Sequence, residues 1–410
     1  MKFVSESHEN AWNKALKLLD PTPAELEHGL ELHQSCFAMD HFGFLPYGTW
    51  NEMFVDTWNE LKAKNIGQRE LSNRMNPVHY DQCCFDDACA RRFRAVMRAS
   101  GLKCMVHTVA EGKGHEADFK RMSCNMQLLR IFRDTIVQAG TPEDIRKING
   151  EGKIAVIWSV NGPPLAGTLC DLHEELEWVD VWRRMGVRLM HLSYNRRNCA
   201  ADGCAESADG GLSDLGRELV AKLNKAGIIV DVPHTGKRSS IEAARVSEKP
   251  IMASHTGARA LFDYIRCKDD ETLRAIAEKD GLIGVCAAAD LLGGSSDLLM
   301  MLKHIRYIAD LIGVDHVGIG TDGMYMHLWP TSDNISDYDN AEFSSAWWGN
   351  WKKYPYDASK SVESYYGSLA WLNWPLFTVG LVKSGFSDDD ISKILGRNFL
   401  RVFEANQVQA

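Results

Sequence analysis

The 410-residue chain lacks the features that mark several large protein classes. No stretch reaches the roughly 18 apolar residues of a membrane span, and the opening MKFVSESHENAWNK has neither the apolar run nor the cleavage pattern of a secretory signal. Its 46 basic and 55 acidic residues give a formal net charge of −9 and are interspersed without a block of like charges. We therefore expect no membrane partner, no nucleic-acid partner and a cytoplasmic location.

Cysteine is present, but not in the spacing of a metal-binding or disulfide scaffold. The chain has 11 cysteines, an odd number, and contains neither a CxxC motif nor the paired Cys and His spacing of zinc fingers. For a cytoplasmic chain the reduced thiol is the expected state, because the cytosolic redox poise disfavours disulfides.

Eight short apolar runs, rich in β-branched residues, predict eight strands. In most of these runs the residues that point to either face of the strand are apolar, as expected for strands buried on both faces of a parallel sheet. The predicted strands are Cys36–Phe44, Leu102–Val109, Lys153–Asn161, Val187–Tyr194, Ile228–His234, Ile251–His255, Leu282–Ala288 and His316–Thr321.

Helical patterns alternate with these strands. In DLGRELVAKLNKAG (214–227), for example, Leu215, Leu219 and Leu223 share one helix face. Eight alternations favour a (β/α)₈ TIM barrel, which we expect to span residues 1–410 as a single α/β domain with a helical segment at 1–30. An aromatic insertion at 325–366, containing WWGNWKKYPYD, follows the eighth strand. It is either a lid or substrate wall, or a packing or dimer contact.

Polar residues end several of the predicted strands, where barrels carry their chemistry. His234 and His255 end consecutive strands, in DVPHTG and ASHTG, and Asp322 follows the last strand in GIGTDG. The two imidazoles are predicted to share a metal ion, with Asp322 as a third ligand or general base. The alternatives are hydrogen-bonded core histidines and an Asp that caps a loop before glycine.

Several segments resemble the renal or membrane dipeptidase family, peptidase family M19 of the amidohydrolase superfamily. They are GVRLMHLSYNRRN, GLSDLGRELVAKLNKAGIIVDVPHTG, IMASHTGARAL, IRCKDDETLRAIAEKDGLIGV, VDHVGIGTDG and ILGRNFLRVFE. The similarity runs over residues 30 to 410 and is weakest at 47–130 and 325–365. It implies the amidohydrolase-like barrel, a small-molecule substrate with a carboxylate, and a homodimer.

The resemblance also implies a binuclear zinc centre, and here the chain departs from the family. His234 and His255 match two of its ligands, but Phe42 and Phe44 stand where the family has an HxD pair, and Asn161 stands for a bridging Glu. A shift of one residue puts His41 in the place of the histidine and still leaves Gly43 for the aspartate. We therefore expect one ion rather than two, with Asn161 and His41 as weak candidate ligands.

Three further residues match the substrate machinery of the family. Arg266 matches the arginine that binds the substrate carboxylate, and Asp322 matches the aspartate that activates water. Tyr194 stands for a histidine that polarises the scissile carbonyl and can still donate one hydrogen bond. Phe42 and Phe44 are expected to make the substrate pocket apolar.

The combined prediction is a dipeptidase-like, metal-dependent hydrolase for a dipeptide or an N-acyl amino acid, with zinc as the metal. Two alternatives stay open. One is specialised chemistry on the altered site, such as a lyase or an iron-dependent oxidation, and the other is an inactive barrel that binds carboxylates.

The loop after the second strand offers replacement ligands. His107, Glu111, His115 and Glu116 lie in CMVHTVAEGKGHEAD, and the competing interpretation is a solvated polar loop.

Overall fold

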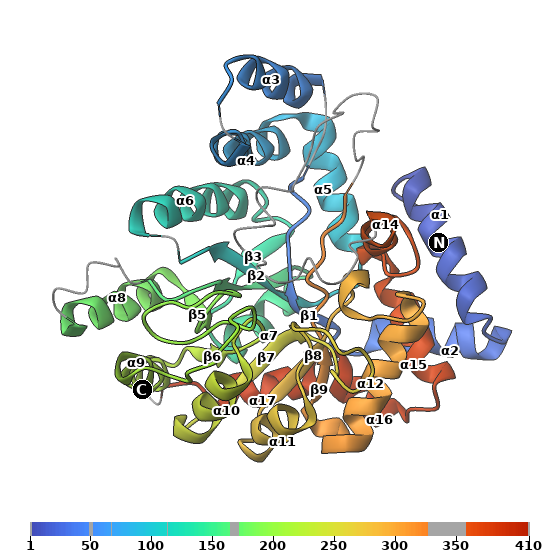
Figure 1. The fold of residues 1–410 in the computed structure, drawn as a ribbon. Coiled ribbons are helices and arrows are strands. Elements are labelled where there is room, and N and C mark those ends of the chain that lie inside the picture. Colours follow the sequence, from blue (N-terminus) through green and yellow to red (C-terminus); the bar gives the residue numbers. More distant parts are fainter. Residues whose placement is uncertain are drawn as a thin grey trace.

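The computed structural model describes residues 2–48, 52–66, 68–112, 114–164, 172–326 and 358–408. It confirms the (β/α)₈ barrel: eight parallel strands follow one another around a nearly closed sheet (Figure 1). In barrel order they are β1 (Met39–Gly43), β2 (Cys104–Ala110), β4 (Ile154–Val160), β5 (Val187–His191), β6 (Ile229–Asp231), β7 (Met252–Thr256), β8 (Leu282–Val285) and β9 (Val317–Ile319).

A ninth strand, β3 (Ile136–Gln138), lies outside this order and was not predicted. It pairs in parallel with Ile154–Val156, the beginning of β4, while the later residues of β4 pair with β5. A run of three residues is too short to show a strand period, so the sequence alone gave no signal for it.

Helices surround the barrel, and two more, α1 and α2, precede β1 (Figure 1). Three helices between β1 and β2, α3 to α5, had no counterpart in our sequence interpretation. The helices are α1 (Glu6–Leu19), α2 (Pro23–Ser35), α3 (Glu52–Ala63), α4 (Gln68–Phe85), α5 (Asp87–Ala99), α6 (His115–Ile131), α7 (Pro142–Gly150), α8 (Leu172–Met185), α9 (Asp214–Ala226), α10 (Lys237–Val246), α11 (Asp270–Glu278), α12 (Leu298–Ile312), α14 (Ala358–Tyr366), α15 (Trp374–Lys383), α16 (Asp388–Ser392) and α17 (Asn398–Ala405).

Side chains alternate between the barrel interior and the surrounding helices. Leu189 of β5 and Ile229 of β6 belong to an interior cluster that also contains Phe399 of α17. Their chain neighbours Met190 and Val230 belong to the larger cluster under the outer helices. This alternation decides which polar residues near the strand ends face the interior.

The barrel closes between β1 and the end of β9. The amide of Asp322 donates to the carbonyl of Phe42, and the amide of Phe44 donates to the carbonyl of Gly323, both at 2.9 Å. The buried carboxylate of Asp40 reinforces the closure, because it accepts from the Thr321 amide at 2.9 Å and from the Thr321 hydroxyl at 2.6 Å. It also accepts from the Trp371 indole at 3.0 Å and from the Phe42 amide at 3.3 Å.

Replacing Asp40 with asparagine is expected to lower the free energy of unfolding by about 1–3 kcal/mol, because one oxygen becomes an NH₂ group that faces donors. Burial raises the pKa of Asp40 from 3.8 to about 7 despite these hydrogen bonds. Protonation of Asp40 therefore stabilises the wild type fully at low pH, and this contribution is lost as the pH rises through about 7. Urea titrations at pH 5 and pH 8 measure both effects.

The decrease in the free energy of unfolding caused by Asp40→Asn is expected to be larger at pH 5 than at pH 8, because only the wild type is stabilised by protonation of Asp40. Asp310→Asn is the control, because Asp310 is exposed on α12. Equal unfolding midpoints for Asp40→Asn and the wild type at both pH values would contradict the role of Asp40 in closing the barrel.

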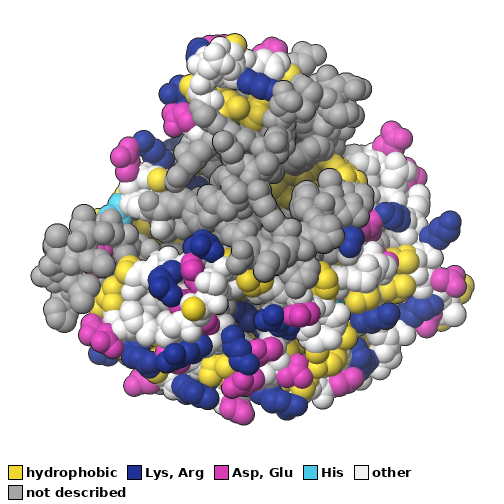
Figure 2. Space-filling model, in the orientation of Figure 1, with side chains coloured by type: hydrophobic (Ala, Val, Ile, Leu, Met, Phe, Trp, Pro, Cys, Tyr) yellow, Lys and Arg dark blue, Asp and Glu magenta, His cyan; other side chains and the backbone are white. Residues whose placement is uncertain are grey.

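Most of the predicted insertion at 325–366, including WWGNWKKYPYD, lies outside the described residues. Of that stretch, Tyr325, Met326 and α14 are described, and α14 contacts the turn that follows β8. None of the described helices is both long and apolar enough to cross a bilayer. On the face shown in Figure 2, basic and acidic side chains alternate over the region of α9 to α11.

Candidate active site

Two histidines face each other at the carboxyl ends of β6 and β7. His234 follows β6 and His255 lies within β7, and both side chains are buried. Their Nε2 atoms are 2.9 Å apart. The structure therefore brings the two predicted metal ligands together.

Hydrogen bonds at the other ring nitrogens fix the tautomer of both histidines. Nδ1 of His234 lies 2.6 Å from the side-chain oxygen of Asn195, which is an acceptor. Nδ1 of His255 lies 2.9 Å from the hydroxyl of Ser254, and this hydroxyl donates its own proton to Asp231 at 2.6 Å. A proton on each Nδ1 satisfies these acceptors, and the two Nε2 lone pairs then face each other and need a proton or a cation between them.

A third histidine, His191 of β5, lies beneath this pair and was missed by the sequence reasoning. Its ring centroid is 5.6 Å from that of His234 and 5.5 Å from that of His255. Its Nε2 is 3.0 Å from the carboxylate of Asp231, and both side chains are fully buried. The signal was the two-residue period of the strand, since His191 shares the parity of the interior residue Leu189.

The guanidinium of Arg266 reaches the histidine pair from the loop after β7. Arg266 is 1% exposed; Nη2 lies 3.3 Å from Nε2 of His234, and Nη1 donates to the carbonyl of Pro233. Within the described part of the chain, no carboxylate lies within ion-pair distance of it. A buried positive charge without an anion is costly, so this guanidinium is suited to an anionic ligand.

Tyr194 and Asp322 lie at the same opening. The ring of Tyr194 stacks on His234, with centroids 4.0 Å apart. Burial, with the charges of Glu111 and Asp322 adding to it, raises the pKa of Tyr194, which keeps its hydroxyl protonated as a donor. Burial likewise raises the pKa of Asp322 to about 6, and Asp322 lines a small cavity of about 80 Å³ together with Thr321 and Trp371.

Comparison with known proteins identifies the scaffold on which these residues sit. Residues 89–341, more than half of the chain, match the family Membrane dipeptidase (Peptidase family M19). The chain belongs to the membrane dipeptidase family. The dipeptidase tcpJ of Claviceps purpurea is 24% identical over 291 residues, which cover 69% of this chain and 58% of the relative. The chain thus spans well under two thirds of that relative's length.

Two solved structures from Pseudomonas aeruginosa share the fold. An amidohydrolase is 24% identical with a TM-score of 0.66, and the match covers 92% of this chain and 98% of that one. The probable dipeptidase PvdM is 21% identical with a TM-score of 0.66, and the match covers 94% and 99% of the two chains. At these identities the likeness concerns the barrel alone.

The positions at which the chain departs from the dipeptidase family are filled by aromatic rings. Phe42 stacks on His255, with ring centroids 4.1 Å apart, and Phe44 meets Phe42 edge to face at 5.8 Å. His41 is placed elsewhere, because its ring lies against Phe399 and over Gly318, whose missing side chain leaves the space. Burial lowers the pKa of His41 to about 3.

Asn161 keeps the place of the bridging glutamate at the end of β4. Its side-chain oxygen accepts from the Thr108 hydroxyl at 3.1 Å, and its NH₂ group donates to Glu111 at 3.0 Å. Two of the replacement ligands considered above are used differently, because His107 bonds to Asn125 at 2.8 Å and His115 stacks on Trp178. Of that loop, Glu111 is the residue that turns toward the site.

Members of the dipeptidase family are in general metal-dependent, but these residues do not fit a binuclear centre. Phe42 and Phe44 carry no donor atom, and neutral Asn161 cannot supply bridging charge. Among the described residues, no group of three or more His, Cys, Asp or Glu is arranged to hold a metal. The facing Nε2 atoms of His234 and His255 remain as two donors that fit one ion, with water or substrate completing its shell.

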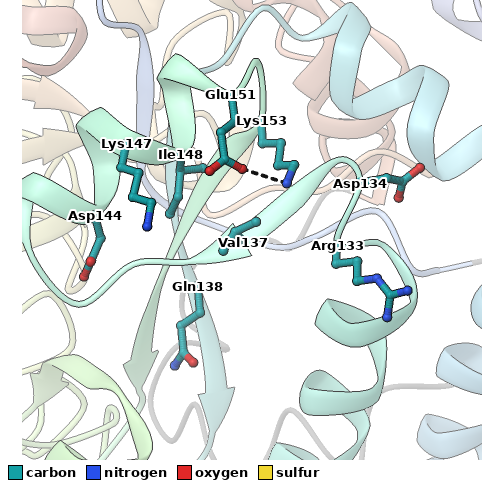
Figure 3. A pocket seen from close by; sticks show the side chains of 9 residues that line it. All are labelled: Arg133, Asp134, Val137, Gln138, Asp144, Lys147, Ile148, Glu151 and Lys153. Carbon is teal, nitrogen blue, oxygen red and sulfur yellow. Dashed lines mark hydrogen bonds and ion pairs between the residues drawn. The ribbon is translucent and has the colours of Figure 1, made fainter.

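A separate pocket of about 650 Å³, whose lining side chains are shown in Figure 3, lies at the opposite end of the barrel. It includes Val137 and Gln138 of β3, which pairs with the beginning of β4, whereas Asn161 follows the end of β4. Basic and acidic side chains alternate around it, and Lys153 pairs with Glu151 at 2.8 Å. Since barrel chemistry lies at the carboxyl ends of the strands, this pocket is not the active-site candidate.

Proposed function

We propose that the protein is a dipeptidase-like hydrolase that cleaves an amide bond in a small substrate carrying a carboxylate, either a dipeptide or an N-acyl amino acid. The observation that carries the proposal is the position of Arg266: a buried guanidinium without a described carboxylate partner, 3.3 Å from a histidine pair. A substrate carboxylate would neutralise this charge and place the adjacent amide bond over the pair.

One divalent ion is part of the proposal, with zinc as the metal. His234 and His255 would hold it through their facing Nε2 atoms, 2.9 Å apart. Asn195 and Ser254 orient the two rings by accepting hydrogen bonds from Nδ1, as is usual for histidines that hold a metal through Nε2. When bound, such an ion polarises the scissile carbonyl and lowers the pKa of a coordinated water.

The residues of the chain would carry the proton transfers. Asp322 accepts the proton of the attacking water and later returns it to the nitrogen of the departing amine, so that one water is consumed per bond cleaved. The Tyr194 hydroxyl donates a hydrogen bond to the oxygen that becomes negative as the tetrahedral intermediate forms. Arg266 holds the carboxylate throughout, and Phe42 shields the His255 side of the site from water.

A measurement of metal content and hydrolysis tests this proposal directly. Protein purified without chelator is incubated with neutral dipeptides and N-acetyl amino acids, and the released amino acid is quantified with and without added zinc. We expect about one zinc per chain and hydrolysis of at least one substrate series, both lost in His234→Ala/His255→Ala. The matched control is His28→Ala, an exposed histidine of α2 paired with Asp388.

Two results would contradict the proposal. Hydrolysis that survives in the double variant would remove the histidine pair from the mechanism. A protein that binds carboxylates without hydrolysing any substrate would instead be the inactive barrel considered above. Iron in place of zinc would favour the oxidative alternative.

The homodimer and the cytoplasmic location stay predictions.

A further inference from the structure

The carboxylate of Glu111 lies beside Asn161, the residue that stands where the dipeptidase family has a glutamate. Glu111 follows β2 directly, and Asn161 follows the neighbouring strand β4. The amide of Asn161 donates to the carbonyl of Ala110 at 2.9 Å and so extends the ladder between the two strands. The Asn161 NH₂ group then meets Oε2 of Glu111 at 3.0 Å.

Two glycines allow this close approach. Gly112 has a φ of +68°, and a Cβ at this position would lie 2.7 Å from the backbone of Gly162. The two loops can therefore pack closely, with Glu111 beside Asn161, because glycine follows each of these residues in AEG at the end of β2 and NG after β4. The two glycines thus specify the contact between Glu111 and Asn161.

The charge of Glu111 acts on two residues of the active-site opening. Its charge raises the pKa of both Tyr194 and Asp322, after the larger effect of burial in each case, which requires it to lie near both. Its other oxygen accepts from Arg121 of α6, and its amide donates to Asp118 at 2.9 Å. The Glu111 side chain is 20% exposed, so solvent or a ligand reaches it.

The opening is therefore dipolar. Arg266 supplies a positive charge from the loop after β7, and Glu111 supplies a negative charge from the end of β2, with Tyr194 under the influence of both. A carboxylate has about four lone-pair positions, so it accepts from several donors at once. An ammonium group has three N–H donors and a positive charge, so it is the ligand group that matches the Glu111 carboxylate.

We infer that Glu111 is a specificity-determining residue that binds a cationic amino group of the substrate, opposite the carboxylate held by Arg266. The inference rests on the proposed function and narrows it to a substrate with a free amino group, such as an unblocked dipeptide, and away from N-acyl compounds. A purely structural Glu111–Arg121 ion pair is the competing explanation.

Calorimetric binding of matched ligand pairs tests the inference without turnover. L-Ala-L-Ala and N-acetyl-L-Ala-L-Ala have the same carboxylate and differ in the amino charge. Both are titrated into Asp322→Asn protein, in which hydrolysis is expected to be about 10²–10⁴-fold slower. We expect the free amine to bind at least about 10-fold more tightly, the range of one charge-assisted hydrogen bond, and this preference to fall below about 3-fold when Glu111→Gln is added.

Controls separate the inference from the proposed function. Glu116→Gln removes an exposed carboxylate of α6 that pairs with Lys120, and it should keep the preference. Glu111→Gln/Arg121→Gln removes both charges of this partly exposed ion pair, in case the single variant unfolds. Equal affinities of the parent protein for the two ligands overturn the inference without any Glu111 variant. If neither ligand binds, the proposed function fails and the inference fails with it.

Discussion

Replacing Arg266 with lysine is expected to lower kcat/KM for a carboxylate-bearing substrate by about 10²–10³-fold. An ammonium group lacks the planar fork that binds a carboxylate with two parallel hydrogen bonds, and each bond to a charged group contributes about 1.5–3 kcal/mol. The lysine nitrogen also cannot replace both present contacts of the guanidinium, to the Pro233 carbonyl and to His234. Steady-state kinetics on the best substrate measure the loss.

The decisive comparison pairs each substrate with its C-terminal amide. The amide has no carboxylate to lose, so Arg266→Lys should reduce its hydrolysis much less than that of the acid. Arg259→Lys is the control: Arg259 lies seven positions earlier in the same loop and pairs with Asp263 at the surface. An equal loss for acid and amide would mean that Arg266 acts by supporting His234 and not by binding the substrate.

The barrel itself was accessible from the sequence because its strands are buried on both faces. Runs such as GIIVDVPH are apolar at nearly every position, and in parallel sheets that pattern predicts a strand directly. The helices α3 to α5 were not, since segments such as QRELSNRMNPVHYDQCCF (α4) are polar and carry a proline within the helix. The stability of α4 comes from packing on α6, a contact between distant parts of the chain, and α3 and α5 pack on α4 in turn.

Within the site, the residues at strand ends were predictable and their supporting partners were not. His234, His255 and Asp322 were found from their place after apolar runs. Asn195 was missed, although it sits one residue after Tyr194, because its hydrogen bond to His234 depends on a left-handed backbone at φ 59°. Glu111 belonged to a loop whose simplest interpretation was solvation, and its contact with Asn161 bridges 50 positions in the sequence.

Replacing Asp322 with asparagine is expected to lower kcat by about 10²–10⁴-fold, the usual contribution of a positioned general base. A base acts in its ionised form, so the wild-type rate should rise with pH through the Asp322 pKa of about 6 and level off above it. The residual rate of the variant should lack this rise. A pH profile of kcat for both proteins, on the same substrate, measures the two effects together.

Stability separates this catalytic role from a structural one. Folding raises the pKa of Asp322 from 3.8 to about 6. Protonation of Asp322 therefore stabilises the folded wild type fully below pH 3.8, and this stabilisation is lost as the pH rises through about 6. At pH 8 the asparagine variant should therefore be at least as stable as the wild type while remaining nearly inactive. Asp290→Asn, in the same small cavity, is the matched control and should keep the pH-dependent rise. A variant that loses activity and stability in parallel would identify Asp322 as a residue that holds β9 against β1 through its backbone, and the base would have to be sought elsewhere.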